Sequence, residues 1–500
     1  MINFIDMLSK IQVKLTFLMI SFLIPLTFTR CQGYEIGIRL NGIQDTTIIL
    51  AHYYNKTIYP DDTARLDLHG KGKFIGKKSL PEGLYVVYLP TTKYFELIIG
   101  KNQNFSIESD TSNLIDHFKV KGSSENDVFY DFQRYMISKK DDLAKLQKSL
   151  SSAPNEQEKI KVRKDIESIN NERINKIKTI NSQYPDLFVA TFLKATLDVE
   201  VPEPPKDKNG KIDSTWQYYY YRHHYFDNFN ISDPRMLRTP LYEDKVMNYL
   251  EKVIPHYTDT INSEVDMLID RTRSDSILFR FMLVTLFNYY GKSQIMGMDA
   301  VQVHIAEKYY IPDAYWSDKK FIDDLKERVA ALKPLLLGKV APDVQLRIVP
   351  VEHFIAAATD TALKKYPHAG SFLNLSQVDA NYIVLIFWEA TCGHCKVAVP
   401  RMYQIYKDSL EKMGVKVIAI STLFGEDGKV EWVNFVNQHK LYDWINAWNP
   451  YDYKFKIIYD IKSTPQIFVL NKKKEIIGKR IGPENVVDLI NAYSKQYPER

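Results

Sequence analysis

Two cysteines separated by two residues, Cys392 and Cys395, are the part of this sequence best suited to chemistry. Gly393 and His394 lie between them, and an apolar run over residues 382–388 precedes them. A strand that leads into a helix starting with Cys-x-x-Cys is the layout of a redox site. Two thiols at this spacing can close a small ring and pass two electrons to the disulfide of another molecule. The spacing therefore predicts a thiol–disulfide redox site.

The third cysteine, Cys31, falls in an N-terminal segment with the pattern of an export signal. Lysines precede an apolar run over residues 15–24, and small residues follow it. The run is shorter than the roughly 20 residues needed to span a bilayer. We expect residues 1–33 to be a signal peptide. Two alternatives stay open, namely a retained, uncleaved anchor and a lipoprotein modified at Cys31.

Removal of that segment leaves Cys392 and Cys395 as the only cysteines of the mature chain. Structural disulfides are common in exported proteins, so their absence from the mature sequence means that packing must stabilise it and that the two thiols are free for chemistry. The formal net charge of +5 is small for 500 residues, and the sequence has no basic stripe. We therefore expect no nucleic acid partner.

The pattern of apolar residues predicts a multidomain chain. Short alternating apolar runs separated by turn residues predict an N-terminal all-β sandwich of about seven or eight strands over residues 34–124. Helical periodicity predicts a central all-α region, with a helical hairpin over 125–200 and a helical domain over 201–337. Over residues 338–500 the order β-α-β-α-β-β-α predicts a C-terminal α/β thioredoxin fold.

An aromatic stretch over residues 216–226 stands out in the second helical region. Its adjacent histidines, His223 and His224, point about 100° apart on a helix, so they do not form an i,i+4 metal pair. We expect the aromatic rings to pack in the core and a histidine to be exposed.

Residues 338–500 resemble the thioredoxin-like domains of bacterial envelope proteins, the TlpA/ResA group. The resemblance rests on Phe-Trp-Glu-Ala-Thr-Cys-Gly-His-Cys-Lys at 387–396, on Pro400 in the following helix, and on Ser-Thr-Pro at 463–465. The lead-in over 338–343 is similar as well. The resemblance implies a thioredoxin fold and thiol–disulfide oxidoreductase activity. The preceding β and helical segments resemble, more loosely, modules of unknown function.

The resemblance also implies roles for individual residues. Cys392 is the expected attacking thiolate, because the N-terminus of a helix favours the charged form of the sulfur. His394 is expected to stabilise this thiolate further, and Cys395 is the expected resolving thiol. Pro465 matches the cis-proline of the family, which leaves the backbone before it exposed to pair with an extended substrate.

The expected substrate contacts are therefore Thr464, which precedes that proline, and Trp388.

The sequence departs from the family in its acidic residues. The buried acid of ordinary thioredoxins falls at Ile386, and the acid that some envelope reductases carry after the second cysteine falls at Ala398. Glu389 is the nearest replacement as proton acceptor for the resolving thiol, although a solvated residue is an equal alternative.

These expectations describe an exported, periplasmic or cell-envelope thiol–disulfide oxidoreductase that reduces disulfides of envelope proteins. Its electron donor would be a membrane or periplasmic thiol. It would need no cofactor beyond the redox-active pair and no metal, because a zinc site would require two further ligands. Oxidation or isomerisation of disulfides is the first alternative. A periplasmic binding or scaffold protein with a thioredoxin-like domain is the second.

Overall fold

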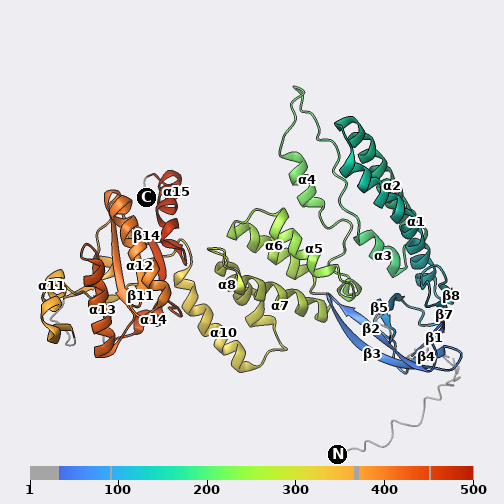
Figure 1. The fold of residues 1–500 in the computed structure, drawn as a ribbon, viewed down its shortest axis with the longest axis horizontal. Coiled ribbons are helices and arrows are strands. Elements are labelled where there is room, and N and C mark those ends of the chain that lie inside the picture. The colour runs from blue at the N-terminus through green and yellow to red at the C-terminus, as the bar shows by residue number, and fades with distance from the viewer. Residues whose placement is uncertain (1–32, 91–92, 365–370, 450–451, 499–500) are drawn as a thin grey trace, which may run out of the picture. The chain divides into compact units, whose positions relative to one another are not determined.

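The structure, a computed structural model, describes residues 33–90, 93–364, 371–449 and 452–498 (Figure 1). The chain forms two compact units, Met1–Lys194 and Ala195–Arg500. The expected fold class is confirmed, with a strand-rich N-terminal region, a central helical region and a C-terminal α/β domain. The predicted signal peptide lies outside the described residues except for Gly33.

The N-terminal region consists of two four-stranded sheets in the described residues, ordered β4-β1-β7-β8 and β3-β2-β5-β6. Buried and exposed residues alternate along β1, where Ile36 and Ile38 are buried whereas Glu35 and Arg39 are exposed. The first sheet therefore has one face in the core and one open face. The strands are β1 (Tyr34–Asn41), β2 (Thr46–Tyr54), β3 (Thr57–Leu66), β4 (Lys71–Gly76), β5 (Gly83–Tyr88), β6 (Tyr94–Ile99), β7 (Asn104–Asp110) and β8 (Lys119–Lys121).

Two long helices, α1 (Ser124–Ser152) and α2 (Glu156–Gln183), follow the sheets and contact each other. The side chain of Ser123 accepts a hydrogen bond at the start of α1, and Asn155 does the same for α2, which satisfies backbone N–H groups of the first turn. The helix α3 (Phe188–Ala195) comes next.

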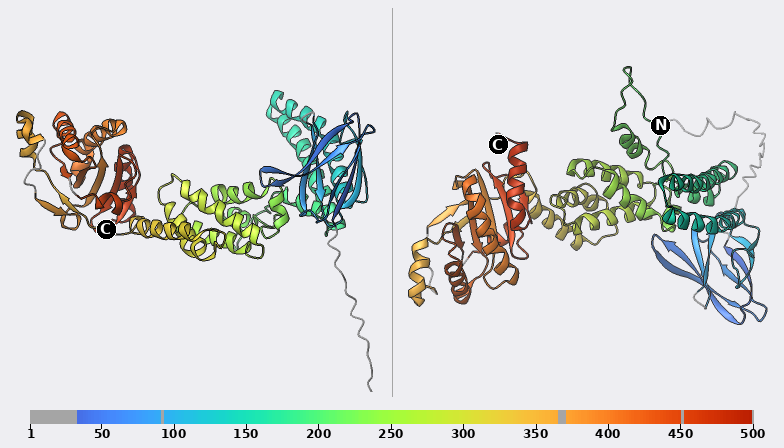
Figure 2. Two further views of the ribbon diagram at one scale, coloured as in Figure 1. Left: turned by 90° about the horizontal axis from the view of Figure 1, so that it is seen from below. Right: turned by 45° about the horizontal axis from the view of Figure 1, so that its top comes forward.

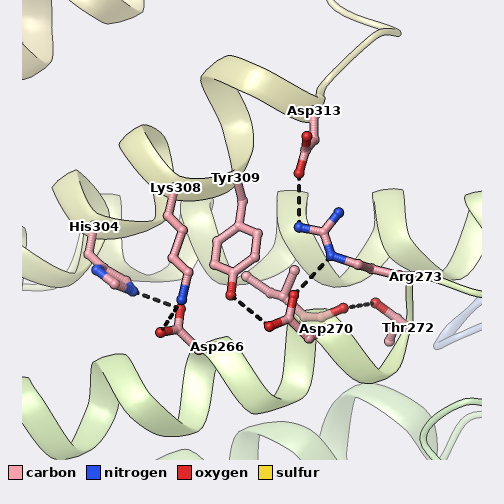
Figure 3. Close-up of polar contacts among 9 residues, drawn as sticks. Asp266, Asp270, Thr272, Arg273, His304, Lys308, Tyr309 and Asp313 are labelled. Atoms are coloured by element: carbon pink, nitrogen blue, oxygen red, sulfur yellow. Dashed lines mark hydrogen bonds and ion pairs between the residues drawn. The ribbon is translucent and has the colours of Figure 1, made fainter.

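The helical part of the second unit contains short and medium helices. Figure 3 shows how polar side chains connect α6 to α8 and to the turn that follows it: the Asp266 carboxylate accepts hydrogen bonds from His304 Nε2 and Lys308 Nζ, each at 2.7 Å. The helices are α4 (Trp216–His224), α5 (Tyr242–Asn248), α6 (Thr258–Arg271), α7 (Ser276–Lys292), α8 (Asp299–Ile305), α9 (Ile311–Asp313) and α10 (Lys319–Leu332), with π-helical turns at Tyr249–Val253 and Ala306–Tyr310 and 3₁₀ turns at Pro234–Arg238 and Lys333–Leu335.

The predicted core packing of the aromatic stretch is wrong for α4, which has no buried residue. Tyr219 is 58% exposed, and His223 is exposed as well. Tyr225, directly after the helix, is buried. Residues of α4 instead line an open cavity of about 690 Å³ together with Glu264 and Arg271. The aromatic content of a helix is therefore a poor guide to its burial here.

The C-terminal domain is built on a five-stranded sheet ordered β13-β12-β11-β14-β15, in which β11 runs parallel to β12 and antiparallel to β14. Helices pack against this sheet (Figure 2). The elements are β9 (Gln345–Arg347), α11 (Val351–Thr359), β10 (Phe372–Asn374), β11 (Tyr382–Trp388), α12 (Gly393–Ile405), β12 (Val415–Ser421), α13 (Gly425–His439), β13 (Ile445–Trp448), α14 (Lys454–Ile458), β14 (Gln466–Asn471), β15 (Ile476–Lys479) and α15 (Val486–Gln496).

The central strand β11 is buried on both faces, which explains why its sequence is continuously apolar. Val384, Ile386 and Trp388 pack in a core with α12, α13 and α15. The residues between them, Ile383, Leu385 and Phe387, pack in a second core that includes residues of α14. With both faces covered and β12 and β14 paired on either side, only the ends of β11 are left accessible.

Polar contacts connect the helical part of the second unit to its C-terminal domain. Lys479 Nζ on β15 donates to the Asp299 carboxylate and to the Leu335 carbonyl. Arg328 of α10 donates to Asp460 at 2.5 Å. In the part of the chain that the structure describes, none of the helices has the length and apolar character of a membrane span.

Candidate active site

Cys392 lies where β11 gives way to α12, as its N-cap residue. Its backbone is extended, with φ −73° and ψ 126°, and the helix begins at Gly393. The side chain is partly exposed, and as a thiol it donates a hydrogen bond to the Thr464 carbonyl at 3.3 Å between Sγ and O. The buried strand thus delivers one thiol to the surface, at the positive end of a helix.

Cys395 lies one turn into the same helix and is fully buried. Its sulfur accepts a long hydrogen bond from the Glu389 backbone N–H at 3.5 Å. It packs in the core that contains Trp388 and Val399. Both thiols are free in the structure. One thiol is therefore accessible to a partner, and the other is reachable only from within the site.

The two thiols differ in acidity. Burial raises the pKa of Cys392, but hydrogen bonds from the backbone N–H groups of Cys395 and His394 and from the side chains of Thr464 and Cys395 outweigh this effect, so that its pKa is lowered. Burial raises the pKa of Cys395 to about 12. Because the thiolate is the nucleophile in disulfide exchange, Cys392 is the sulfur prepared to attack first.

The segment Thr464–Pro465 lies against the thiols, and its peptide bond is cis. The contact between Cys392 Sγ and the Thr464 carbonyl joins residues 72 positions apart in the chain. Pro465 directly precedes β14, which pairs with β11. The structure thus brings together four residues that the sequence singled out: Cys392, Cys395, Thr464 and Pro465.

Glu389 immediately follows β11, and two residues without a signal in the sequence hold its carboxylate. Thr422, directly after β12, donates from Oγ1 to Glu389 Oε1 at 2.5 Å. Lys456 of α14 lies 3.9 Å from the same oxygen. Both are distant in sequence, and only the parallel pairing of β11 with β12 indicates that Thr422 lies near Glu389.

The expected substrate contact through Trp388 requires a correction. Its indole is fully buried and packs against Phe435, with ring centroids 5.0 Å apart. Trp388 has the same strand parity as Val384 and Ile386, so its side chain points into the core and is closed to a substrate. His394, in contrast, is exposed next to Cys392.

An exposed aromatic side chain lies near the carboxylate of Glu389. Phe424 is 62% exposed, and its ring packs against that of Tyr453 with centroids 5.4 Å apart. Lys456 Nζ lies 5.8 Å from the centre of the Phe424 ring and also approaches Glu389. Phe424 is thus an accessible apolar surface beside the site, in contrast to the buried Trp388.

Three family models match parts of the chain. A thioredoxin-like family matches residues 379–476. The domain of unknown function DUF4369 matches residues 34–129, and the domain of unknown function DUF5106 matches residues 157–329. No curated protein matches the chain.

Several solved structures are similar to parts of the chain. A thioredoxin-like protein from Bacteroides caccae is 18% identical and is covered over 99% of its length by 59% of this chain, with a TM-score of 0.41. A domain named a possible thiol-disulfide isomerase, from Cytophaga hutchinsonii, is 33% identical over 99% of its length and 33% of this chain, with a TM-score of 0.27. The thioredoxin domain of a thiol-disulfide oxidoreductase from Bacteroides vulgatus is 19% identical over 96% of its length and 31% of this chain, with a TM-score of 0.25.

The match to the family model covers the Cys-x-x-Cys pair and the Thr464–Pro465 segment. The order of the five strands and the position of the pair at the start of α12 are those expected of a thioredoxin fold. The C-terminal domain of this chain therefore belongs to the thioredoxin-like family, and two domains of unknown function precede it.

Proposed function

We propose that this protein is an exported thiol–disulfide oxidoreductase that reduces disulfides of envelope proteins through Cys392 and Cys395. The observation that carries the proposal is the difference between the two thiols. Cys392 is accessible and has a lowered pKa, whereas Cys395 is buried and has a pKa of about 12. An attacking thiolate and a protected resolving thiol need these two environments.

In the first step, the Cys392 thiolate attacks one sulfur of a partner disulfide. The S–S bond of the partner breaks, a mixed disulfide forms at Cys392, and the partner's other sulfur leaves as a thiolate that takes up a proton. In the second step, Cys395 loses its proton and attacks Cys392 Sγ. This releases the second partner thiol and leaves a Cys392–Cys395 disulfide, so that two electrons have passed to the partner. A membrane or periplasmic thiol donor would reduce the pair again.

Glu389 is our candidate for the group that takes the proton of Cys395. Thr422 and Lys456 orient its carboxylate, and its own backbone N–H contacts the sulfur of Cys395. Ile386 and Ala398, at the two positions where the resemblance leads one to expect an acid, carry no proton acceptor. Removal of this proton is needed only in the second step, so Glu389 would act after the partner is bound.

Two surfaces support a role in binding partner proteins. The carbonyl of Thr464 faces the attacking sulfur, which suits a partner whose extended backbone pairs beside the reacting disulfide. Phe424 offers an exposed apolar contact next to Lys456.

His394, exposed beside Cys392, would add a positive charge when protonated and so stabilise the thiolate.

Oxidation or isomerisation of disulfides is the second candidate function, because a stabilised Cys392 thiolate favours the reduced pair and makes the disulfide a stronger oxidant. The reduction potential of the pair distinguishes the two directions. A value near about −270 mV favours reduction of partners, and a value near about −120 mV favours their oxidation.

Trapping of mixed disulfides tests the function itself. With Cys395→Ser the second step cannot occur, so partner proteins should remain linked to Cys392 when the variant is expressed in a cell that exports it. The matched control is the double variant Cys392→Ser/Cys395→Ser, which should trap no partner. If Cys395→Ser yields no thiol-releasable partners above this control, the oxidoreductase proposal fails and a scaffold function replaces it.

A further inference from the structure

The open face of the sheet β4-β1-β7-β8 carries lysines on its two outer strands. β4 exposes Lys71 and Lys73, and β8 exposes Lys119 and Lys121. We call these four residues the lysine rails. They come from positions nearly 50 residues apart in the sequence, so only the sheet brings the two rails onto one surface.

In one row between the rails, the two central strands carry small side chains. The strand register places Lys73, Gly37, Ser106 and Lys121 in one row across the four strands. A Cβ atom added at Gly37 would lie 3.3 Å from the Cβ of Ser106, so the two central strands pack closely at this row. With only a hydrogen and a hydroxymethyl group as side chains, the floor of the row is flat. A groove of about 330 Å³ lies over this floor, with both rails among its walls.

Two of the five positive charges along the groove have ion-pair partners, and Lys71 also interacts with the charge of Asp67. The next row contains Arg39 and Glu108, which form an ion pair at 3.5 Å. Lys73 pairs with Glu35 at 2.6 Å. The other lysines of the rails have no ion-pair partner among the described residues. The groove therefore favours a ligand that carries several negative charges.

The spacing of the lysines matches an extended polypeptide. Lysines two residues apart on one strand lie about 6.8 Å apart, and the two rails are separated by three strand spacings, about 14 Å. In an extended chain, side chains point alternately to opposite sides and repeat on each side at the same distance of about 6.8 Å. A run of acidic residues laid along β1 and β7 can therefore reach both rails in register.

We propose that this groove binds an extended run of consecutive Asp or Glu residues from another polypeptide. The site lies in the first unit and involves neither thiol, so it does not depend on the proposed redox function. A single-stranded nucleic acid fits less well, because no aromatic side chain lies between the rails for its bases to stack on. A lipid surface fits less well too, because Ile75 is the only large apolar side chain exposed on these four strands.

Fluorescence anisotropy on the full-length mature chain tests the proposal, with a labelled peptide containing a run of consecutive Glu residues. The variant Lys119→Gln/Lys121→Gln should weaken its binding about tenfold, because two charge contacts are lost. The matched control is Lys161→Gln/Lys164→Gln, which removes the same charge from exposed positions of α2 in the same unit. The control should bind like the parent protein.

A second variant separates the groove from general electrostatic attraction. Ser106→Leu fills the floor without changing any charge, and it should weaken binding of the same peptide severalfold while the circular dichroism spectrum of the protein stays unchanged. A second peptide with the same number of Glu residues, each separated by three neutral residues, should bind more weakly than the consecutive run.

Equal binding of the two peptides would overturn the proposal, and so would equal loss of binding in the rail variant and its control. The proposal is also overturned if vesicles containing phosphatidylglycerol or single-stranded DNA bind through the rail lysines while the peptide does not.

Discussion

The sheet of the thioredoxin-like domain and the sheet β4-β1-β7-β8 differ in which of their parts is accessible. The sheet of the thioredoxin-like domain has apolar cores on both faces, so its accessible chemistry lies at the end of the central strand, where Cys392 begins α12. The sheet β4-β1-β7-β8 has a core on one face only, and its other face carries the lysine rails. One site depends on a few residues in fixed geometry, whereas the other depends on charge spread over two outer strands.

This difference determines how sensitive each sheet should be to substitution. A covered sheet concentrates its function in single atoms, such as the sulfur of Cys392, and its stability in buried side chains. An open face distributes its function and its stability over many side chains, since each lysine alone contributes little to binding or to folding. Single substitutions should therefore have large effects in the C-terminal domain and small effects on the open face.

The largest effect is expected for Cys392→Ser, which should abolish reduction of a disulfide-containing protein substrate because the attacking sulfur is gone. The domain should remain folded, since Cys392 is partly exposed at the start of a helix. Val397→Ala, at an exposed position of α12, is the control and should keep the parental rate. Residual activity in Cys392→Ser would show that the function does not rest on this single atom.

The next effect concerns stability and compares the two sheets directly. Trp388→Ala should lower the free energy of unfolding of the C-terminal domain by about 3–5 kcal/mol, because it empties a fully buried site. Arg39→Ala on the open face should change the stability of the first unit by less than about 0.5 kcal/mol. Denaturant unfolding followed by circular dichroism measures both, and similar values for the two variants would contradict the difference in burial.

A smaller effect is expected for Glu389→Gln, which should slow the release of the mixed disulfide about tenfold because Cys395 loses its proton acceptor. The rate at which Cys392 is alkylated should stay close to that of the parent. Stopped-flow kinetics with a chromogenic disulfide separate the two steps. Thr422→Val, which removes the hydrogen bond to the same carboxylate, should show a weaker form of this defect. Slowing of the first step alone would exclude Glu389 from the second.

The smallest effect is expected for Phe424→Ala, which should raise the KM for a protein substrate a few-fold and leave kcat nearly unchanged. The reason is that an exposed apolar contact contributes to binding and not to the transfer of electrons. Reduction of a small disulfide that is too short to reach Phe424 should be unaffected, and it serves as the control. A fall in kcat with both substrates would mean that Phe424 supports the thiols themselves.

The redox site could be predicted from sequence to the extent that its signals are local. The apolar run of β11, the Cys-x-x-Cys spacing and the Ser-Thr-Pro segment are all readable as short patterns. The partners of Glu389 could not be found this way, because Thr422 and Lys456 come from separate elements. The burial of Trp388 was predictable in principle, since it has the same strand parity as Val384 and Ile386.

The lysine rails on the open face could not be predicted from short sequence patterns, for a related physical reason. The rails lie on β4 and β8, and their juxtaposition follows from strand pairing between segments far apart in the chain. For the aromatic stretch, a local sequence pattern was present but the prediction drawn from it was wrong. Its rings suggested a core, yet α4 has no buried residue, because composition alone does not determine which helix is covered.

The difference in acidity between the two thiols is the central claim, and alkylation of the reduced protein as a function of pH tests it most directly. The fraction of thiolate rises with pH, so Cys392 should become reactive at a lower pH than an ordinary thiol, because its pKa is lowered. Cys395, with a pKa of about 12, should remain unmodified at neutral pH. Mass spectrometry of the two residues should therefore find the label on Cys392 alone. Labelling of Cys395 first, or of both at the same pH, would contradict this account.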